Sequence, residues 1–223
     1  YLQRQADGEQ LFEVEVEKEY LQDVMLNFIL AGRDTTAQTI MWGMYLLSIN
    51  EDICEKLYNE VKDVNIEYDE LKDLKYTENF INEVLRLYPP VPTDGKSAID
   101  HDVLPNGVRV HPAQTVAWLQ NEMGRMKRYF PEPLKVIPER WEDWEKYNGG
   151  VECHLNKGAM IPFQYGPRIC LGKQLAMYES KAVLALIVKK FKFELAPNQD
   201  VVRHPNITIC AKNGIKFKVK SRK

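Results

Sequence analysis

One of the four cysteines stands where the sequence could present a reactive or metal-binding thiolate. Cys170 lies near the end of the run FQYGPRICLG, residues 163–172, and an apolar stretch without helix breakers follows as far as Val188. The turn residues Gly166 and Pro167 and the apolar stretch predict a loop that enters a buried helix over 171–188. At a helix N-terminus, free N–H groups and the helix dipole stabilise a thiolate, the form that binds a metal or attacks carbon.

The residues next to this cysteine indicate what kind of ligand its thiolate would bind. Gly166 and Gly172 would let the backbone pass close to a flat ligand. Arg168 could form charge-assisted hydrogen bonds with a carboxylate on that ligand. The alternative is that Cys170 is one more buried free cysteine, which is the usual fate of an isolated Cys.

A second group of chemical residues interrupts a long apolar segment, Tyr20–Asn50, which contains no proline and predicts one helix. The interruption is AGRDTT, residues 31–36. A glycine costs a helix up to about 1 kcal/mol relative to alanine, and adjacent threonines add to that cost. Such a local conflict indicates a functional site. Taken alone, Asp34 would be interpreted first as part of a solvated helix face.

A third pattern precedes a double proline, Pro89-Pro90, where another helix must end. Glu83 and Arg86 lie one turn apart on one face of that helix. Charged pairs at this spacing are common on helix surfaces and contribute little there. The spacing alone therefore does not show whether Glu83 and Arg86 are more than a surface pair; the surrounding motifs must decide this.

Composition narrows the classes of function. The chain has 223 residues, is 44% hydrophobic and carries a formal net charge of -2, so it is globular in composition and offers no basic field for nucleic acid. The other cysteines, Cys54, Cys153 and Cys210, are far apart and form no metal-type spacing, which suggests neither a disulfide framework nor a structural metal and favours a reducing compartment. No stretch reads as a membrane span or a signal peptide.

In chain order, the motifs read A-G-x-D-T-T, E-x-x-R and F-x-x-G-x-R-x-C-x-G. Together they resemble the cytochrome P450 monooxygenases over essentially the whole chain. The resemblance implies haem b, with Cys170 as the axial thiolate ligand of its iron. The residues that it places around the haem are Phe163, Gly166, Arg168 and Gly172, and Lys96, which stands where many members have an arginine that binds a propionate.

The resemblance also gives the other motifs a role. Asp34 and Thr35 would be the acid and the alcohol that deliver protons to dioxygen, with the helix opening over the haem and Thr35 bonding back to the carbonyl of Ala31. Arg140, in the run PERW, would join Glu83 and Arg86 in a buried structural network.

The implied fold is mainly α with a minor β-sheet, the C-terminal half of the cytochrome P450 fold. Residues 1–223 would form a partial domain that runs from the oxygen-binding helix to a C-terminal hairpin, the N-terminal half with its membrane anchor being absent. Short strands and turns are predicted over 91–120, and a polar surface loop over 144–157. The hairpin would pair Ile207 and Ile209 with the strand 215–219 across a type I′ turn at Asn213-Gly214.

The resemblance implies insertion of one oxygen atom from O2 into a C–H bond of a lipophilic substrate, with electrons from NADPH through NADPH-cytochrome P450 reductase. The full-length form would lie at the cytosolic face of the endoplasmic reticulum membrane. Asp94, Lys96 and Arg125-Met126 resemble the branch that hydroxylates fatty acids and alkanes near the terminal methyl group. Two alternatives remain open. One is a haem-thiolate isomerase or dehydratase, disfavoured by the Asp-Thr-Thr segment; the other is a truncated remnant that binds no haem.

Overall fold

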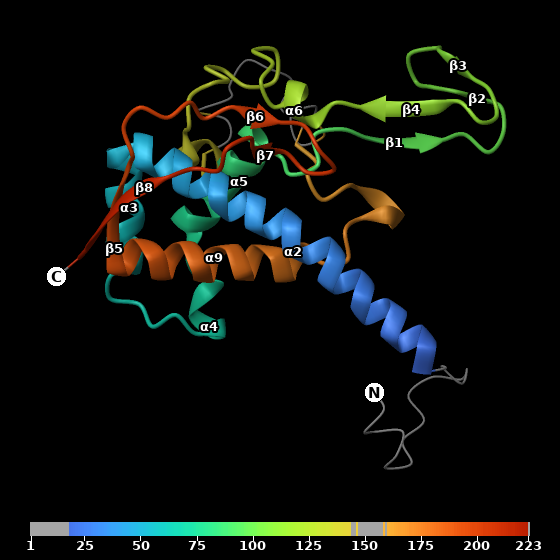
Figure 1. Ribbon diagram of the computed structural model, residues 1–223. Helices are drawn as coiled ribbons and strands as arrows, with labels where there is room; N and C mark the ends of the chain where they lie inside the picture. The colour runs from blue at the N-terminus through green and yellow to red at the C-terminus, as the bar shows by residue number, and fades with distance from the viewer. Residues whose placement is uncertain (1–17, 144–145, 147–157, 159, 223) are drawn as a thin grey trace. The chain divides into compact units, whose positions relative to one another are not determined.

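The computed structural model describes residues 18–143, 146, 158 and 160–222 (Figure 1). The chain divides into two compact units, Tyr1–Arg33 and Asp34–Lys223. The described part of the first unit is the N-terminal half of helix α2, and every other described element belongs to the second unit. Most of the loop predicted over 144–157, including Cys153 and Trp144, lies outside the described residues.

The described elements are mainly helical, which confirms the predicted fold class. The helices are α2 (Lys18–Ile49), α3 (Glu51–Val61), α4 (Tyr68–Leu71), α5 (Lys75–Leu87), α6 (Gln120–Met123) and α9 (Lys173–Lys190), with 3-10 turns η1 (Pro138–Trp141) and η2 (Gly166–Arg168). Helix α5 ends just before the double proline because the residue before a proline is disfavoured in helical conformation. None of the described helices combines the length and apolarity needed to cross a bilayer.

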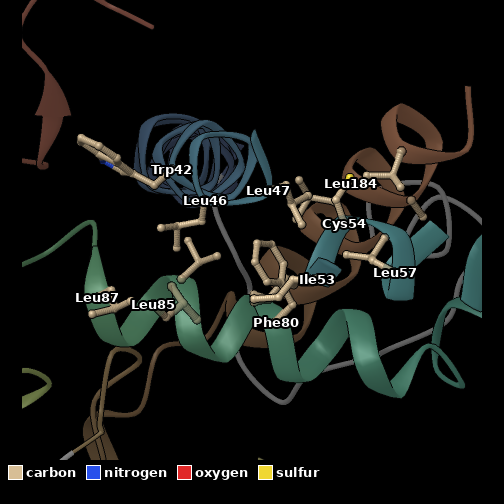
Figure 2. Close-up of a cluster of buried hydrophobic side chains, with 14 of the residues drawn as sticks. Trp42, Leu46, Leu47, Ile53, Cys54, Leu57, Phe80, Leu85, Leu87 and Leu184 are labelled. Atoms are coloured by element: carbon tan, nitrogen blue, oxygen red, sulfur yellow. The ribbon is translucent and has the colours of Figure 1, made fainter. Parts of the chain in front are cut away.

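Four helices of the second unit share one apolar core. Leu47 of α2, Leu57 of α3, Phe80 of α5 and Leu184 of α9 are almost completely buried in it (Figure 2). At Gly43, an added Cβ would lie in ordinary van der Waals contact with Leu184 at 3.4 Å and with Phe80 at 3.6 Å, so α2 packs closely on α5 and α9 here. The core therefore fixes α9, the helix that follows Cys170, against α3 and α5.

A second contact ties α2 to distant segments of the chain. The Trp42 ring stacks on Tyr88 with 4.3 Å between centroids, and its Nε1 donates a hydrogen bond to the carbonyl oxygen of Ile209 at 3.0 Å. The N–H of Ile209 donates in turn to the carbonyl oxygen of Pro90 at 2.9 Å. The segment after α5 and the C-terminal strands are thus held side by side.

The described strands form four two-stranded antiparallel sheets, β1–β4, β2–β3, β5–β8 and β6–β7. Their bounds are Asp94–Ser97 (β1), Asp102–Val103 (β2), Arg109–Val110 (β3), Thr115–Trp118 (β4), Phe191–Leu195 (β5), Arg203–His204 (β6), Cys210–Ala211 (β7) and Phe217–Ser221 (β8). The short strands predicted over 91–120 are present, and Gly107 has a φ of 83° in the predicted turn between β2 and β3.

The predicted C-terminal hairpin is wrong. Strand β8 pairs with β5, which leaves α9 directly, and β7 pairs with β6. A type I′ turn needs positive φ at both central residues, but only Gly214 has one (67°), and Asn213 does not. The longer β5–β8 pairing also brings Phe193 and Phe217 into edge contact, with ring centroids 5.8 Å apart. A shorter hairpin, β6–β7, carries Ile207 in its connecting loop.

The helix after Cys170 begins and ends later than predicted. Helix α9 runs Lys173–Lys190 rather than 171–188, with Gly172 at its N-cap. Leu171 is 84% exposed and adds nothing to the core that would draw it into the helix. At the other end, Lys189 and Lys190 extend the last turn, where the helix dipole favours positive charge.

Candidate functional site

The loop before α9 holds the Cys170 thiol at the surface of the second unit. The N–H of Cys170 donates to the carbonyl oxygen of Phe163 at 2.7 Å, and the N–H of Ile169 donates to that of Gly166 at 3.1 Å. The N–H of Lys173, the first residue of α9, donates to the carbonyl oxygen of Cys170 at 3.3 Å. These bonds close the loop on itself and attach it to the helix, while the cysteine side chain stays exposed.

Two glycines shape the space beside this thiol. Gly166 has a φ of 73°, a conformation that residues with a side chain rarely adopt, and a Cβ added to it would meet no atom of the described residues within 4 Å. A Cβ at Gly172 would lie 4.0 Å from Sγ of Cys170. The backbone therefore favours glycine at 166, and a side chain at 172 would begin in van der Waals contact with the sulfur.

Large apolar side chains around the thiol lack cover among the described residues. Tyr165 is 82% exposed, and Ile169, Leu171 and Leu175 are also exposed. Phe163 is half-buried against the core, and Arg168 is exposed to solvent. An open thiol, an apolar rim and an exposed guanidinium fit the needs of haem, which is a flat apolar ring with an iron that accepts thiolate and two propionates that accept from arginine.

The other residues predicted around this group come from separate elements. Lys96 is exposed on β1 opposite Val116 of β4, whereas the 163–172 loop contains no strand. Asp34 and Thr35 lie on α2, Asp34 exposed and Thr35 half-buried. The structure thus joins Phe163, Gly166, Arg168, Cys170 and Gly172 in one loop and places the remaining candidates on other elements.

The expected opening of α2 at the AGRDTT segment is wrong. The helix is continuous from Lys18 to Ile49, and a Cβ on Gly32 would meet none of the described residues within 4 Å outside its own helix backbone. The propensity cost of one glycine, about 1 kcal/mol, is small beside the cooperativity of a helix of this length. One turn on, Oγ1 of Thr39 donates to the carbonyl oxygen of Thr35 at 3.0 Å.

The structure brings Glu83, Arg86 and Arg140 together in the interior. The side chains of all three are fully buried. Arg86 makes a two-bonded pair with Glu83, from Nε to Oε1 at 2.8 Å and from Nη2 to Oε2 at 2.7 Å. Nε of Arg140 lies 3.3 Å from Oε1 of the same carboxylate. Burial lowers the pKa of Arg140, and the Glu83 charge opposes that effect.

The network has further members that the sequence did not indicate. Glu83 also accepts from the N–H of Ile137 at 2.8 Å and from Nε1 of Trp141 at 2.9 Å. Arg86 donates to the carbonyl oxygens of Gly124, Pro133 and Lys135. The network therefore fastens the segment 124–141 to helix α5.

Gly124 is the tightest point of this attachment. A Cβ there would lie 2.3 Å from the carbonyl oxygen of Arg86, closer than any real side chain approaches a backbone atom. The sequence shows a glycine between Met123 and Arg125, but it does not show that glycine is required there. The requirement comes from the packing of α5 against this segment.

Known proteins with similar sequences identify the family to which these motifs point. The family model described as Cytochrome P450 matches residues 1–219. Cytochrome P450 94A1 of Vicia sativa is 37% identical over 85% of this chain and 37% of its own length. Cytochrome P450 704B1 of Arabidopsis thaliana is 34% identical over 91% of this chain and 44% of its own length. Alkane hydroxylase MAH1 of Arabidopsis thaliana is 34% identical over 90% of this chain and 39% of its own length.

The chain therefore belongs to the cytochrome P450 family, a family of haem-thiolate monooxygenases. It spans about two fifths of the length of the curated relatives that it matches. The family membership predicted from the three motifs is confirmed.

Proposed function

We propose that this chain is the C-terminal part of a haem-thiolate monooxygenase that inserts one oxygen atom from O2 into a C–H bond. The whole of 1–223 would be a partial domain, completed by an N-terminal half outside this sequence. The share of each relative that the chain covers supports this division. The observation that carries the proposal is the exposed Cys170 thiol, in a loop where the backbone N–H of Cys170 donates to the carbonyl oxygen of Phe163 and where Gly166 and Gly172 flank the cysteine.

Each residue of the loop has a definite task in this proposal. Cys170, as thiolate, would bind the iron, and Arg168 would bind a propionate. Gly166 and Gly172 would leave room for the ring, and Phe163 would fix the loop to the core. When bound, haem would supply the redox centre at which dioxygen is activated. Lys96 would contribute a positive charge toward a second propionate, without the bidentate fork of an arginine.

Asp34 and Thr35 would supply protons during oxygen activation. The exposed Asp34 carboxyl can exchange protons with solvent, and the half-buried Thr35 hydroxyl can pass them inward. A monooxygenase needs this delivery, whereas an isomerase or a dehydratase that uses the same thiolate does not. The pair therefore favours the monooxygenase.

Replacing Thr35 by alanine should uncouple NADPH consumption from product formation. We expect haem content to stay unchanged and product formation to fall by about tenfold or more, with reducing equivalents lost as hydrogen peroxide or water. Product and peroxide formed per NADPH consumed would be measured. The control variant Thr39→Ala removes an equivalent hydroxyl one turn along α2, and its product formed per NADPH consumed should stay normal. A normal ratio of product to NADPH in Thr35→Ala would reject the role of Thr35.

The substrate that we propose is a medium- to long-chain fatty acid or alkane, hydroxylated at or near its terminal methyl group. One relative is named an alkane hydroxylase. In this chain, the bond from Ile209 to Pro90 places the segment Val91-Pro92 beside the β6–β7 hairpin, whose loop carries the 91% exposed Ile207. Apolar side chains from these two segments suit an alkyl chain.

The redox and membrane context belongs to the same proposal. Electrons would come from NADPH through NADPH-cytochrome P450 reductase, and the full-length protein would lie at the cytosolic face of the endoplasmic reticulum membrane. Family membership is what supports both parts of this proposal.

A turnover assay on a full-length, haem-loaded form tests the function. With reductase and NADPH, dodecanoate should increase oxygen uptake and yield a product hydroxylated at or next to the terminal carbon. Turnover of a sterol with no binding of dodecanoate or dodecane would reject the substrate. Conversion of a substrate without any uptake of oxygen would reject the monooxygenase in favour of an isomerase or dehydratase.

A further inference from the structure

Arg125 differs from the other arginines that are not exposed. The described residues contain four such side chains, Arg86, Arg125, Arg140 and Arg222. Three of them lie within 4.0 Å of a carboxylate oxygen, on Glu83 or Glu55. Arg125 makes no ion pair with any described residue. It donates instead to the carbonyl oxygens of Leu87 and Asn121 and to Oδ1 of Asn121.

A second guanidinium is held against the first. Nη1 of Arg203, on β6, donates at 2.8 Å to Oδ1 of Asn121, the same oxygen that Nη1 of Arg125 contacts. Both guanidinium carbons approach the Tyr88 ring, at 5.5 Å for Arg125 and 5.8 Å for Arg203 from its centroid. Strand β6 lies close to helix α6 (Figure 1), and Arg203 of β6 and Arg125, two residues after α6, thus bring two positive charges to one amide oxygen of α6.

This arrangement is unfavourable without an anion. Burial, reinforced by the charge of Arg203, lowers the pKa of Arg125 to about 10. Glu122, the nearest carboxylate in sequence, raises the pKa of Arg125 through its charge but makes no ion pair with it; its Oε1 accepts from Nδ2 of Asn121 at 2.7 Å. Two adjacent cations that share one neutral acceptor would be stabilised by a negative group placed between them.

Donors remain for such a group. Nε and Nη2 of Arg203 make no hydrogen bond with any described residue, and these two atoms form the edge that matches a carboxylate. The hydroxyl of Tyr88 likewise has no hydrogen-bond partner in the described part of the chain. Arg203 is exposed, so a ligand can reach it from solvent.

We propose that Arg125, Arg203 and Tyr88 form a carboxylate-binding site that receives the acid group of a fatty-acid substrate. The proposal rests on the proposed function and deepens it. The N–H of Asn121 donates to the carbonyl oxygen of Pro92 at 3.2 Å, and Arg203 begins the hairpin that carries Ile207. The site therefore adjoins the apolar segments assigned to the substrate, and preference for acids over alkanes would reside in this chain.

The test compares an acid with its uncharged ester. Dissociation constants of dodecanoate and methyl dodecanoate would be taken from substrate-induced spectral shifts of the full-length, haem-loaded protein. We expect the wild type to bind the acid more tightly. Arg203→Gln should weaken acid binding about tenfold or more and leave ester binding unchanged, because one hydrogen-bonded charge pair is lost. Arg203→Lys should be intermediate, and Arg128→Gln, which removes an exposed charge elsewhere, should change neither.

Equal binding of acid and ester by the wild type, or equal weakening of both by Arg203→Gln, would overturn the site. If neither compound shifts the spectrum, the proposed substrate class is wrong. The site is then tested by adding octanoate and measuring the midpoint of thermal unfolding. A rise in the midpoint that Arg203→Gln abolishes would support a carboxylate site independent of that substrate. No rise, or a rise equal in the variant, would overturn it.

Discussion

Replacing Arg86 by leucine should destabilise the protein by about 3–5 kcal/mol, because it leaves the buried charge of Glu83 without its two-bonded partner. The carbonyl oxygens of Gly124, Pro133 and Lys135 would lose their donor as well. A loss of this size approaches the whole stability of many domains. We expect little soluble protein and poor haem retention, before any specific kinetic change.

The measurement is the urea midpoint of the full-length protein, together with haem content and soluble yield. Glu83→Gln and Arg140→Leu should act in the same direction. The matched control is Lys72→Leu, which removes a pair with Asp69 at the same i, i+3 spacing but on the surface; its effect should be within about 0.5 kcal/mol. An Arg86→Leu protein that is soluble, haem-replete and of unchanged midpoint would contradict the structural role of the network.

Replacing Cys170 by serine should abolish haem binding through sulfur while leaving the fold intact. A serine hydroxyl remains protonated where a thiol can ionise, and it is a poor ligand for iron that takes soft donors. Because the Cys170 side chain is exposed, its loss removes little packing. The ratio of haem to protein should therefore fall sharply, while the urea midpoint of the haem-free protein should stay unchanged.

The other cysteines are internal controls for that variant. Burial raises the pKa of the Cys54 thiol, so this residue is a neutral core side chain, and Cys54→Ser should lower stability without loss of ligation. Cys210→Ser, and Cys153→Ser in the undescribed segment, should keep the haem. Full haem content in Cys170→Ser, with loss in one of the others, would show that the ligand is misassigned.

The sequence was most informative where local chemistry decides the structure. Gly166 and Pro167 predict a turn in any context, and Gly166 does adopt a positive φ. The helix ahead of Pro89 ends where proline geometry requires. Family membership followed from the motifs, and the spacing of Glu83 and Arg86 on one helix face is also set locally.

The sequence did not predict the features that depend on which distant segments pack together. The alternating residues of β8 fit a strand but do not say whether β7 or β5 is its partner, and β5 offered the longer register. The need for glycine at 124 appears only when the Arg86 carbonyl is placed against it. The convergence of Arg125 and Arg203 is likewise invisible in the sequence, since 77 residues separate them and Asn121 joins them.

The most direct test of the central claim is the reduced, carbon monoxide-difference spectrum of the full-length protein. If Cys170 provides a thiolate to the iron, the wild type and the Cys54, Cys153 and Cys210 variants should show the long-wavelength band characteristic of thiolate ligation, and Cys170→Ser should not. A wild-type spectrum typical of a histidine-bound haem, or no haem at all in a correctly folded full-length protein, would contradict the account.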